Sequence, residues 1–348
     1  MKTWDVVVIG GGVIGLSLAL ELRRSGMAVI VLEKHQPGHE ASWAAGGMIA
    51  EAEAGTNALF RRLARASAAM YPAFARQLRD ESGTDIDLRE HGTIRFLVDD
   101  HCPSPPGTPL SADDIRKLEP DVEYSAPATF LSERCVDPRL LLDALLGAAK
   151  HLKIDISAGS EVTGIEAANG RVTAAITTKS RYAAAVIVNC AGAWAGQLAP
   201  IKIPMIPVKG QMLAVAPNMI KHVVRGNGVY LIPRSSGKLV IGATVEEAGF
   251  DKRVQPDVIQ RMHRAAAILA PKIGQLRILE DWAGLRPRTP DNLPIMSGTS
   301  MQGYFVSSGH YRDGIMLAPI AATMMTKLIR EEQPEIPIDD FSLARFSR

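Results

Sequence analysis

Cysteine is scarce in this chain of 348 residues. Its three cysteines, Cys102, Cys135 and Cys190, are odd in number, widely spaced and without a CxxC pair. This pattern argues against a disulfide framework and against a zinc site, whose ligands occur at short, paired spacings. We therefore expect no metal, and we expect each thiol to be a buried or surface side chain without a chemical role.

The sequence also lacks a large net charge and a long apolar run; its formal net charge is only +2. Lys and Arg number 39, Asp and Glu 37, and no basic run is interleaved with aromatic residues, so we expect no nucleic acid partner and no membrane partner. The first apolar run is short, follows Asp5 and leads into glycines, unlike a signal peptide or membrane span. These features predict a cytoplasmic protein, and the length predicts two domains.

A glycine-rich turn near the N-terminus is the most informative feature that is present. Residues 6–9 form an apolar, β-branched run typical of a buried parallel strand, and Gly10-x-Gly12-x-x-Gly15 then leads into a helix. The first glycine allows the tight turn, the second lets the backbone approach a pyrophosphate, and the third lets helix and strand pack closely. The phosphates would accept hydrogen bonds from free N–H groups at the helix N-terminus.

An acidic residue follows at the spacing that a dinucleotide site requires. Residues 28–32 read as a second strand, and Glu33 lies at its carboxyl end, where it would accept hydrogen bonds from the ribose hydroxyls of an adenosine. A GxGxxG pattern alone is also typical of flexible loops, but strand, helix, strand and acid occur here in the right order. Glu33 argues against a 2′-phosphorylated cofactor, because its carboxylate would lie beside the negatively charged 2′-phosphate.

The remaining patterns predict an interrupted nucleotide-binding domain. Helices are expected at 56–81, 139–152, 256–269 and 314–329, a short helix begins at Ser111, and loops are expected at 36–47 and 102–109. Strand signals dominate from residue 154, including single strands at 181–189 and 305–307, and antiparallel strands are expected at 211–216, 228–233 and 238–243. The fold class is therefore α/β, a Rossmann-like domain with an inserted, antiparallel α+β domain.

Seven segments resemble the FAD-dependent D-amino acid oxidase superfamily, with the greatest likeness to the glycine oxidases of thiamine biosynthesis. The resemblance runs in order from residue 1 to about residue 330, and the C-terminal segments are its specific part. The segments are residues 6–15, 41–48, 207–211, 230–234, 242–244, 282–287 and 309–315.

The resemblance implies an FAD domain made of residues 1–85, 137–205 and 285–348, and a substrate domain made of residues 86–136 and 206–284. It implies oxidation of glycine or another small amino acid or amine, such as sarcosine, D-alanine or D-proline, to an imino acid by hydride transfer to the flavin, with molecular oxygen reduced to hydrogen peroxide. It also implies a homo-oligomer, a tetramer by the family's habit.

The same resemblance assigns site residues. Tyr230 and Arg286 would hold the substrate carboxylate, with Met48 and Arg312 beside the substrate. The residues that would contact FAD are Gly10, Gly12, Val13, Ile14, Gly15, Glu33, Lys34, Ala41, Ser42, Gly46, Gly47, Met48, Val162, His310, Tyr311, Arg312, Asp313, Gly314, Ile315 and Met316. Three residues depart from the family pattern and bear on the flavin environment and the substrate: Asp313 replaces Asn, Trp43 interrupts a run of small residues, and Arg288 replaces a small residue.

The residues support part of this assignment by themselves. Arg286 precedes Pro287 at the end of an apolar segment, so it leaves a rigid backbone, and a guanidinium pairs bidentately with a carboxylate. The alternatives are a structural arginine at 286, a core tyrosine at 230, a core methionine at 48 and a satisfied turn histidine at 310. Residues 309–314 precede a helix whose N-terminus would stabilise an anionic reduced flavin, with His310 and Arg312 as further sources of positive charge.

The reaction requires no catalytic base, since a hydride can leave directly once the α-carbon is placed over the flavin. In agreement, the sequence has no Ser/His/Asp arrangement, HExxH motif or Walker sequence. No cysteine falls in the C-terminal segments that resemble flavin contacts, which predicts non-covalent FAD. Two alternatives remain open: a dehydrogenase of the same fold that passes electrons to a quinone or carrier, and a non-catalytic redox sensor.

Overall fold

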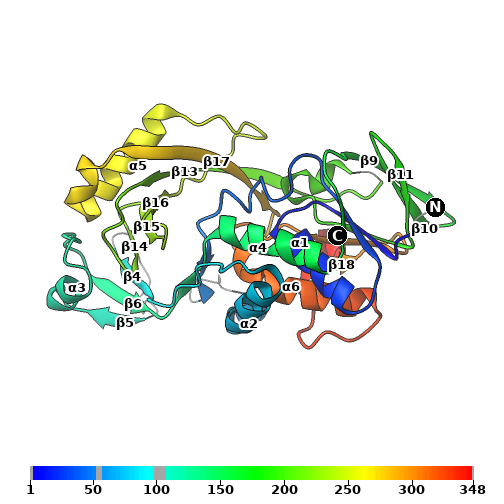
Figure 1. The fold of residues 1–348 in the computed structure, drawn as a ribbon, viewed down its shortest axis with the longest axis horizontal. Helices are drawn as coiled ribbons and strands as arrows, with labels where there is room; N and C mark the ends of the chain where they lie inside the picture. The colour runs from blue at the N-terminus through cyan, green and yellow to red at the C-terminus, as the bar shows by residue number, and fades with distance from the viewer. Residues whose placement is uncertain (1–2, 52–56, 98–106, 199, 347–348) are drawn as a thin grey trace.

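The computed structural model describes residues 3–51, 57–97, 107–198 and 200–346. Within these residues the strands form two large sheets and two small ones. Figure 1 shows the larger sheet toward one end of the molecule, a group of helices at its centre, and a small sheet at the other end. The two large sheets correspond to the two kinds of domain expected from the sequence, whereas the exact domain boundaries stay a prediction.

The first large sheet has six strands, five of them parallel. Its strands are β1 (Val6–Ile9), β2 (Val29–Leu32), β8 (Asp155–Ser157), β12 (Val186–Asn189), β18 (Ile295–Gly298) and β19 (Tyr304–Ser308). Their order is β18-β19-β12-β1-β2-β8, with only β18 antiparallel to its neighbour. The glycine-rich turn therefore follows a strand deep inside the sheet, where parallel strands end at a common edge.

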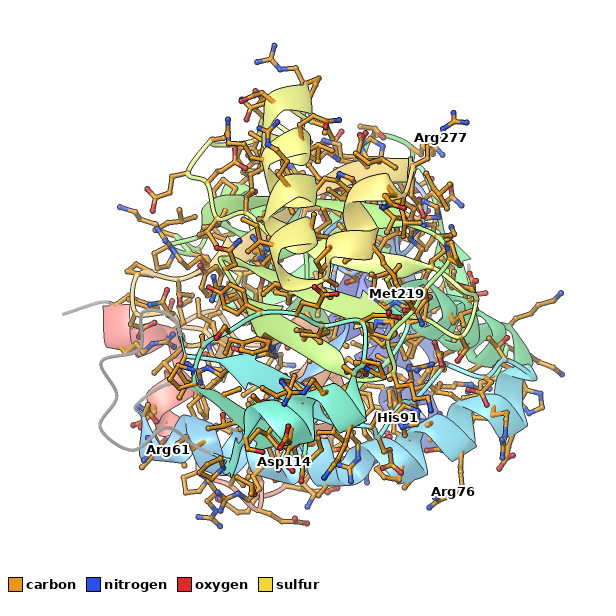
Figure 2. All side chains as sticks on the ribbon, turned by 90° about the vertical axis from the view of Figure 1, so that its left-hand side faces the viewer. Arg61, Arg76, His91, Asp114, Met219 and Arg277 are labelled. Carbon is orange, nitrogen blue, oxygen red and sulfur yellow. The ribbon has the colours of Figure 1, made fainter. Side chains whose placement is uncertain are left out.

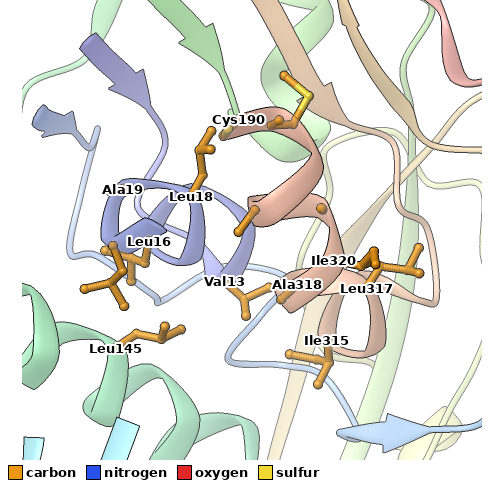
Figure 3. Close-up of a cluster of buried hydrophobic side chains, with 14 of the residues drawn as sticks. Val13, Leu16, Leu18, Ala19, Leu145, Cys190, Ile315, Leu317, Ala318 and Ile320 are labelled. Carbon is orange, nitrogen blue, oxygen red and sulfur yellow. The ribbon is translucent and has the colours of Figure 1, made fainter. Parts of the chain in front are cut away.

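Helices cover one face of this sheet, and a small sheet covers the other. The helices are α1 (Val13–Arg24), α2 (Ala58–Ser82), α4 (Pro138–His151) and α6 (Gly314–Ile329). The small sheet contains β9 (Val162–Ala168), β10 (Arg171–Thr177) and β11 (Arg181–Ala183). Val6 and Val8 pack against the helices, whereas Val7 and Ile9 pack against the small sheet, so β1 is buried on both faces. Figure 3 shows the apolar contact between α1 and α6.

The second large sheet has eight strands in the order β17-β13-β16-β15-β14-β4-β6-β5. Its strands are β4 (Thr93–Phe96), β5 (Thr108–Leu110), β6 (Ala128–Leu131), β13 (Ile206–Val215), β14 (Val223–Gly226), β15 (Val229–Pro233), β16 (Leu239–Gly242) and β17 (Ile278–Arg288). Helix α5 (Pro256–Leu269) packs on its outer face, in front of the strands in Figure 2, and α3 (Ala112–Leu118) lies beside β5. Met212 and Trp282 lie on the opposite face of the sheet and pack near Ala44, in the loop that follows β2.

Short elements complete the described chain. They are β3 (Met48–Ile49), β7 (Arg134–Cys135), and the 3₁₀ helices η2 (Gly192–Gln197), η3 (Pro271–Gln275), η4 (Asp339–Phe341) and η5 (Leu343–Phe346). None of the helices in the described part of the chain is long and apolar enough to cross a membrane. Cys135 and Cys190 are buried free thiols, and Cys102 lies outside the described residues.

Most predicted elements are confirmed, and two expectations need correction. Residues 181–189 form two strands, β11 and β12, which belong to different sheets because the chain turns at Ala184 and Ala185. Thr108 and Pro109, expected in a loop, lie in β5, where proline is tolerated because β5 is an edge strand. The rest of the expected loop 102–109 is outside the described residues apart from Gly107, and β14 was not predicted at all.

Candidate active site

A cavity of about 800 Å³ extends from the carboxyl ends of β1 and β2 to the inner face of the eight-stranded sheet. Its volume lies within the range of ligand sites, roughly 300–1,000 Å³. Ile9 and Leu32 line one end, and Tyr230 and Arg286 line the part beside the larger sheet. One continuous cavity thus contains the glycine-rich turn and the residues expected to hold a carboxylate.

All but two of the predicted site residues line this cavity. The residues that line it are Gly10, Gly12, Val13, Ile14, Glu33, Lys34, Ala41, Ser42, Gly46, Gly47, Met48, Val162, Tyr230, Arg286, His310, Tyr311, Arg312, Asp313, Gly314 and Ile315. Gly15 instead lies where α1 crosses β1, and a Cβ there would be 2.0 Å from the carbonyl oxygen of Gly10. Met316 is buried in the core around α6, with 1% of its surface exposed, and does not line the cavity.

The glycine-rich turn has the geometry that its spacing predicts. Gly10 has a φ of +103°, and a Cβ at this position would lie 2.5 Å from the carbonyl oxygen of Cys190 at the end of β12. Only glycine fits both the conformation and the close approach. The N–H groups of Gly12 and Ile14 donate to no acceptor among the described residues, and both residues line the cavity.

Glu33 and Ser42 hold this turn in shape. The carboxylate of Glu33 accepts hydrogen bonds from the N–H of Gly11, at 2.8 Å, and from the N–H of His35, at 2.9 Å. The Oγ of Ser42 accepts from the N–H of Val13, at 3.0 Å, in the first turn of α1. Glu33 therefore has a structural role that the sequence did not reveal, besides lining the cavity.

Arg286 is fixed by backbone groups of the neighbouring strand and loop. Its Nη1 donates to the carbonyl oxygen of Thr244, at 2.9 Å, and to that of Lys209, at 3.3 Å. The guanidinium lies directly over Gly210, where a Cβ would be 2.3 Å from Nη1. Gly210, on β13, thus leaves room for the side chain of Arg286, and the hydrogen bonds fix the orientation of this half-buried guanidinium.

Tyr230 faces the same cavity from β15. Its ring packs over Gly242 of β16, where a Cβ would lie 2.7 Å from Cε2, and near Gly46 of the loop that follows β2. Tyr230 lines the cavity, and a tyrosine hydroxyl in a partly buried place normally has a hydrogen-bond partner. A ligand in the cavity would supply one.

His310 is neutral, which corrects the idea that it adds positive charge. The side chain is 3% exposed, and burial lowers the pKa of His310 to about 3. Its Nε2 is buried and has no hydrogen-bond partner among the described residues. Arg312 is exposed, with its guanidinium carbon 5.5 Å from the ring centre of Tyr311, and remains a source of positive charge at this turn.

The three departures from the family pattern have distinct surroundings. Trp43 stacks under the guanidinium of Arg139, 3.7 Å from its ring centre. Arg288 forms an ion pair with Glu247. Asp313 occupies the position before α6 without a side-chain cap, so its carboxylate lies next to the helix N-terminus.

Several cavity residues were not predicted, and two of them are arginines. Arg95 on β4 and Arg225 on β14 line the cavity, and so do Glu40, Trp194 and Met212. No motif marks Arg95 or Arg225, because their proximity depends on the pairing of β4 with β14. An arginine in each of two neighbouring inner strands would have been the only signal, and it could not be used because β14 was not predicted.

Comparison with known proteins agrees with this geometry. A family model described as FAD dependent oxidoreductase matches residues 5–328. Glycine oxidase from Geobacillus kaustophilus (strain HTA426) is 33% identical, over 98% of this chain and 97% of the relative. The crystal structure of glycine oxidase from Geobacillus kaustophilus superposes with a TM-score of 0.93, at 31% identity and 99% coverage of both chains.

A longer relative shows the same match over part of its length. The bifunctional protein ThiO/ThiG of Trichormus variabilis (strain ATCC 29413 / PCC 7937) is 31% identical over 99% of this chain, which spans only 56% of that protein. The family model covers nearly the whole described fold, including both large sheets. The chain therefore belongs to the family of FAD-dependent oxidoreductases that includes D-amino acid oxidase, and FAD is its cofactor.

Proposed function

We propose that the protein oxidises glycine or another small amino acid or amine, with FAD as the electron acceptor and molecular oxygen as the final oxidant. The observation that carries this proposal is the guanidinium of Arg286, held by two carbonyl oxygens inside the cavity that contains the dinucleotide turn. The names of the glycine oxidase and ThiO/ThiG relatives support the substrate class and a link to thiamine biosynthesis.

The residues of the cavity fit FAD. The N–H groups of Gly12 and Ile14 would donate to the pyrophosphate at the N-terminus of α1. Glu33 keeps lone pairs on the cavity side for ribose hydroxyls, since each of its oxygens accepts only one protein hydrogen bond. The buried Nε2 of His310 is an orphan polar atom at the opposite end of the dinucleotide path, as expected where a ring system would cover it.

The residues of the larger sheet would bind and orient the substrate. Arg286 would take the α-carboxylate, because a guanidinium offers a planar pair of donors that fixes both position and direction. The hydroxyl of Tyr230 would donate to the same carboxylate from the other side. When bound, FAD supplies the redox chemistry by accepting a hydride from the α-carbon, and the protein's part is positioning and exclusion of water.

No protein base is required by this arrangement, provided that the amine is neutral. His310 has a lowered pKa and is neutral at physiological pH, so it adds no charge that would repel an ammonium or disturb the amine. Non-covalent FAD remains the prediction, because among the described residues the only cysteine that lines the cavity is Cys190, and burial raises the pKa of its thiol far above its usual range.

The proposal is tested with the purified, yellow protein. Anaerobic titration with glycine, sarcosine, D-alanine and D-proline should bleach the flavin bands, and the same substrates under air should give hydrogen peroxide in equal amount to the imino acid product. Bleaching without peroxide, together with reduction of an added quinone, would instead support the dehydrogenase. No bleaching by any amino acid would contradict the enzymatic function and favour the redox sensor.

A further inference from the structure

Two of the segments singled out in the sequence, residues 207–211 and 242–244, lie next to each other in the larger sheet. Strand β16 ends at Gly242, yet the chain stays on β13, because the Oγ1 of Thr244 accepts a hydrogen bond from the N–H of Gln211, at 2.8 Å. The N–H of Thr244 donates in return to the carbonyl oxygen of Gln211, at 3.3 Å. The Thr244 hydroxyl thus continues the attachment to β13 where regular strand pairing has stopped.

This attachment places the two carbonyl oxygens that hold Arg286. Lys209 and Glu246 form a backbone bridge, with N–H to carbonyl distances of 2.8 and 3.0 Å. The Nη1 of Arg286 donates to the carbonyl oxygens of Thr244 and Lys209. The orientation of the guanidinium therefore depends on how residues 244–246 lie along β13.

A buried polar network behind the strand fixes that position. Gln211 has no exposed surface, and its Nε2 donates to the Oε1 of Glu246, at 2.9 Å, and to the Oε1 of Gln255, at 3.1 Å. The Oε1 of Gln211 accepts from the N–H of Gln255, at 2.7 Å, just before α5. The Thr244 hydroxyl donates to the same Oε1 of Glu246. Each polar group of Gln211 is used, and a satisfied buried network of this kind favours a single geometry.

The network does not touch the substrate site directly. Gly210 and Met212, on either side of Gln211 in β13, line the cavity, so Gln211 points to the opposite face of the sheet. Thr244 and Glu246 do not line the cavity either. An effect of these side chains on a ligand carboxylate must therefore pass through Arg286.

We propose that Thr244, Gln211 and Glu246 are positioning residues that hold Arg286 in the orientation in which it binds the substrate carboxylate. This inference rests on the proposed function, in which Arg286 binds that carboxylate. It assigns a role to the two segments at 207–211 and 242–244, which supply the carbonyl oxygens and the hydroxyl that fixes them.

Thr244→Val tests the proposal with shape kept and the hydroxyl lost. A methyl group cannot stay 2.8 Å from the N–H of Gln211, since carbon contacts are roughly 3.5–4.0 Å, so the segment should move away from β13 by about 1 Å. A displacement of that size can cost up to roughly 100-fold. Titration of the FAD-loaded protein with acetate, followed in the flavin spectrum, should show a Kd raised at least about tenfold.

Two further threonine variants complete this titration. Thr244→Ser keeps the hydroxyl and should bind acetate as tightly as wild type. Thr299→Val is the matched control, because Thr299 is also half-buried and bonds the backbone of Met301 through its hydroxyl, outside the cavity. An unchanged Kd in Thr244→Val, or an equal rise in Thr299→Val, would overturn the proposal.

A second pair of variants at Glu246 tests the same network if Thr244→Val does not fold. The side chain of Glu246 is 26% exposed, so its replacement buries no new group. Glu246→Gln keeps an oxygen that can accept from Thr244 and Gln211, and it should bind acetate nearly as tightly as wild type. Glu246→Ala loses that acceptor and should bind acetate several-fold more weakly. Equal binding by the two variants would contradict the role of Glu246.

A double-mutant cycle separates positioning of Arg286 from general support of the fold. Thr244→Val should lower kcat/KM for glycine at least about tenfold in wild type but less than about threefold in Arg286→Lys, because a flexible ammonium depends less on the two carbonyl oxygens. FAD content should stay equal in all four proteins. The same fold-loss in both backgrounds would show that Thr244 does not act through Arg286.

The two assays also separate this inference from the proposed function. Glycine oxidised normally, with Thr244→Val and Glu246→Ala equal to wild type in acetate Kd and kcat/KM, would leave the proposed function standing and overturn the positioning role. Acetate binding that depends on Arg286 and on the Thr244 hydroxyl, without oxidation of any amino acid, would uphold the positioning role and contradict the proposed function.

Discussion

Arg286 is oriented before any substrate arrives, because its Nη1 donates to the carbonyl oxygens of Thr244 and Lys209. A guanidinium that is already oriented loses little conformational freedom when a carboxylate binds, which favours both affinity and a single substrate pose. The same contacts mean that Arg286 also ties β17 to β13 and to the loop after β16. Experiments on this residue must therefore separate substrate binding from local structure.

Arg286→Ala should lower kcat/KM for amino acids by the equivalent of about 2–5 kcal/mol, the usual cost of truncating one partner of a buried charge pair. Arg286→Lys should recover only part of the loss, because an ammonium lacks the planar fork. FAD content and the melting temperature serve as structural checks. Amines without a carboxylate should be oxidised equally well by both variants and wild type; a parallel loss for these amines would show that Arg286 supports the flavin or the fold.

Gly210→Ala should impair catalysis although it replaces no substrate-binding side chain. The added Cβ would lie 2.3–2.5 Å from the guanidinium atoms of Arg286, which is the mobile end of a side chain and can move aside. A displacement of about 1 Å can reduce activity roughly 100-fold. Gly164→Ala is the control, since a Cβ there meets nothing within 4 Å. Full activity of Gly210→Ala would mean that the position of Arg286 is unimportant.

His310 should make the protein less stable in mild acid. Its folded pKa is about 3 because of burial, whereas an exposed histidine has a pKa near 6.5, so below about pH 6.5 the unfolded chain binds a proton that the folded protein does not. Its contribution to the free energy of unfolding should fall by about 2 kcal/mol between pH 7 and pH 5. Urea unfolding of wild type and His310→Gln at pH 7 and pH 5 measures the free energy of unfolding. An equal decrease of this free energy in both proteins would contradict the prediction.

At the scale of elements, helix starts are set by local chemistry. Ser111 and Asp114 form a capping box at the start of α3, and Asp137 accepts a hydrogen bond from the N–H of Arg139, at 2.9 Å, at the start of α4. Both starts were predicted, because a capping side chain acts on N–H groups only two or three residues away.

β14 was missed because its four residues are too few to show a period, and its partners lie elsewhere in the chain.

Asp137 should contribute to stability in two separable ways. It caps α4, and its carboxylate lies 3.8 Å from the Nε of Arg234, which is 4% exposed. Asp137→Asn keeps the cap and loses the charge, whereas Asp137→Ala loses both. Chemical denaturation should show Asp137→Ala less stable than Asp137→Asn by about 1 kcal/mol, the usual value of an N-cap. Equal stabilities would show that the cap contributes nothing here.

At the scale of the whole molecule, one aromatic cluster joins the two large sheets. The guanidinium carbon of Arg139, on α4, lies 3.7 Å from the ring centre of Trp43 and 4.7 Å from that of Trp282 on β17. The Nη1 of Arg139 also donates to Glu280 of β17, at 2.9 Å. This cluster connects the loop that borders the dinucleotide turn to the strand that carries Arg286.

Arg139→Lys should weaken this connection while keeping its charge. An ammonium pairs with Glu280 but cannot stack as a plane between two indoles, so we expect a loss of about 1–2 kcal/mol in the free energy of unfolding. Tryptophan emission should change, and FAD should dissociate more readily because the loop around Trp43 loosens. Arg261→Lys, on the exposed surface of α5, is the control. Unchanged stability and FAD affinity in Arg139→Lys would show that the cluster does not join the two halves.

The sequence by itself determined the dinucleotide half of the protein. The turn at Gly10, Gly12 and Gly15, the strand before it and Glu33 after it were all predicted, because backbone conformation and side-chain period are local properties that a short segment displays. The homo-oligomer and the domain boundaries stay predictions, and β17 continues through Arg288, past the boundary expected at 284.

Only the tertiary structure decided what surrounds the substrate end of the cavity. The fit of Arg286 over Gly210, the burial that keeps His310 neutral and the proximity of Arg95 and Arg225 all depend on which strands pair and in which register. Register between strands far apart in the chain is a collective result of packing the whole sheet, and a shift of one residue would turn these side chains to the opposite face. For that physical reason the cofactor turn can be derived from a short segment of sequence, whereas the arrangement of side chains around the substrate appears only in the folded protein.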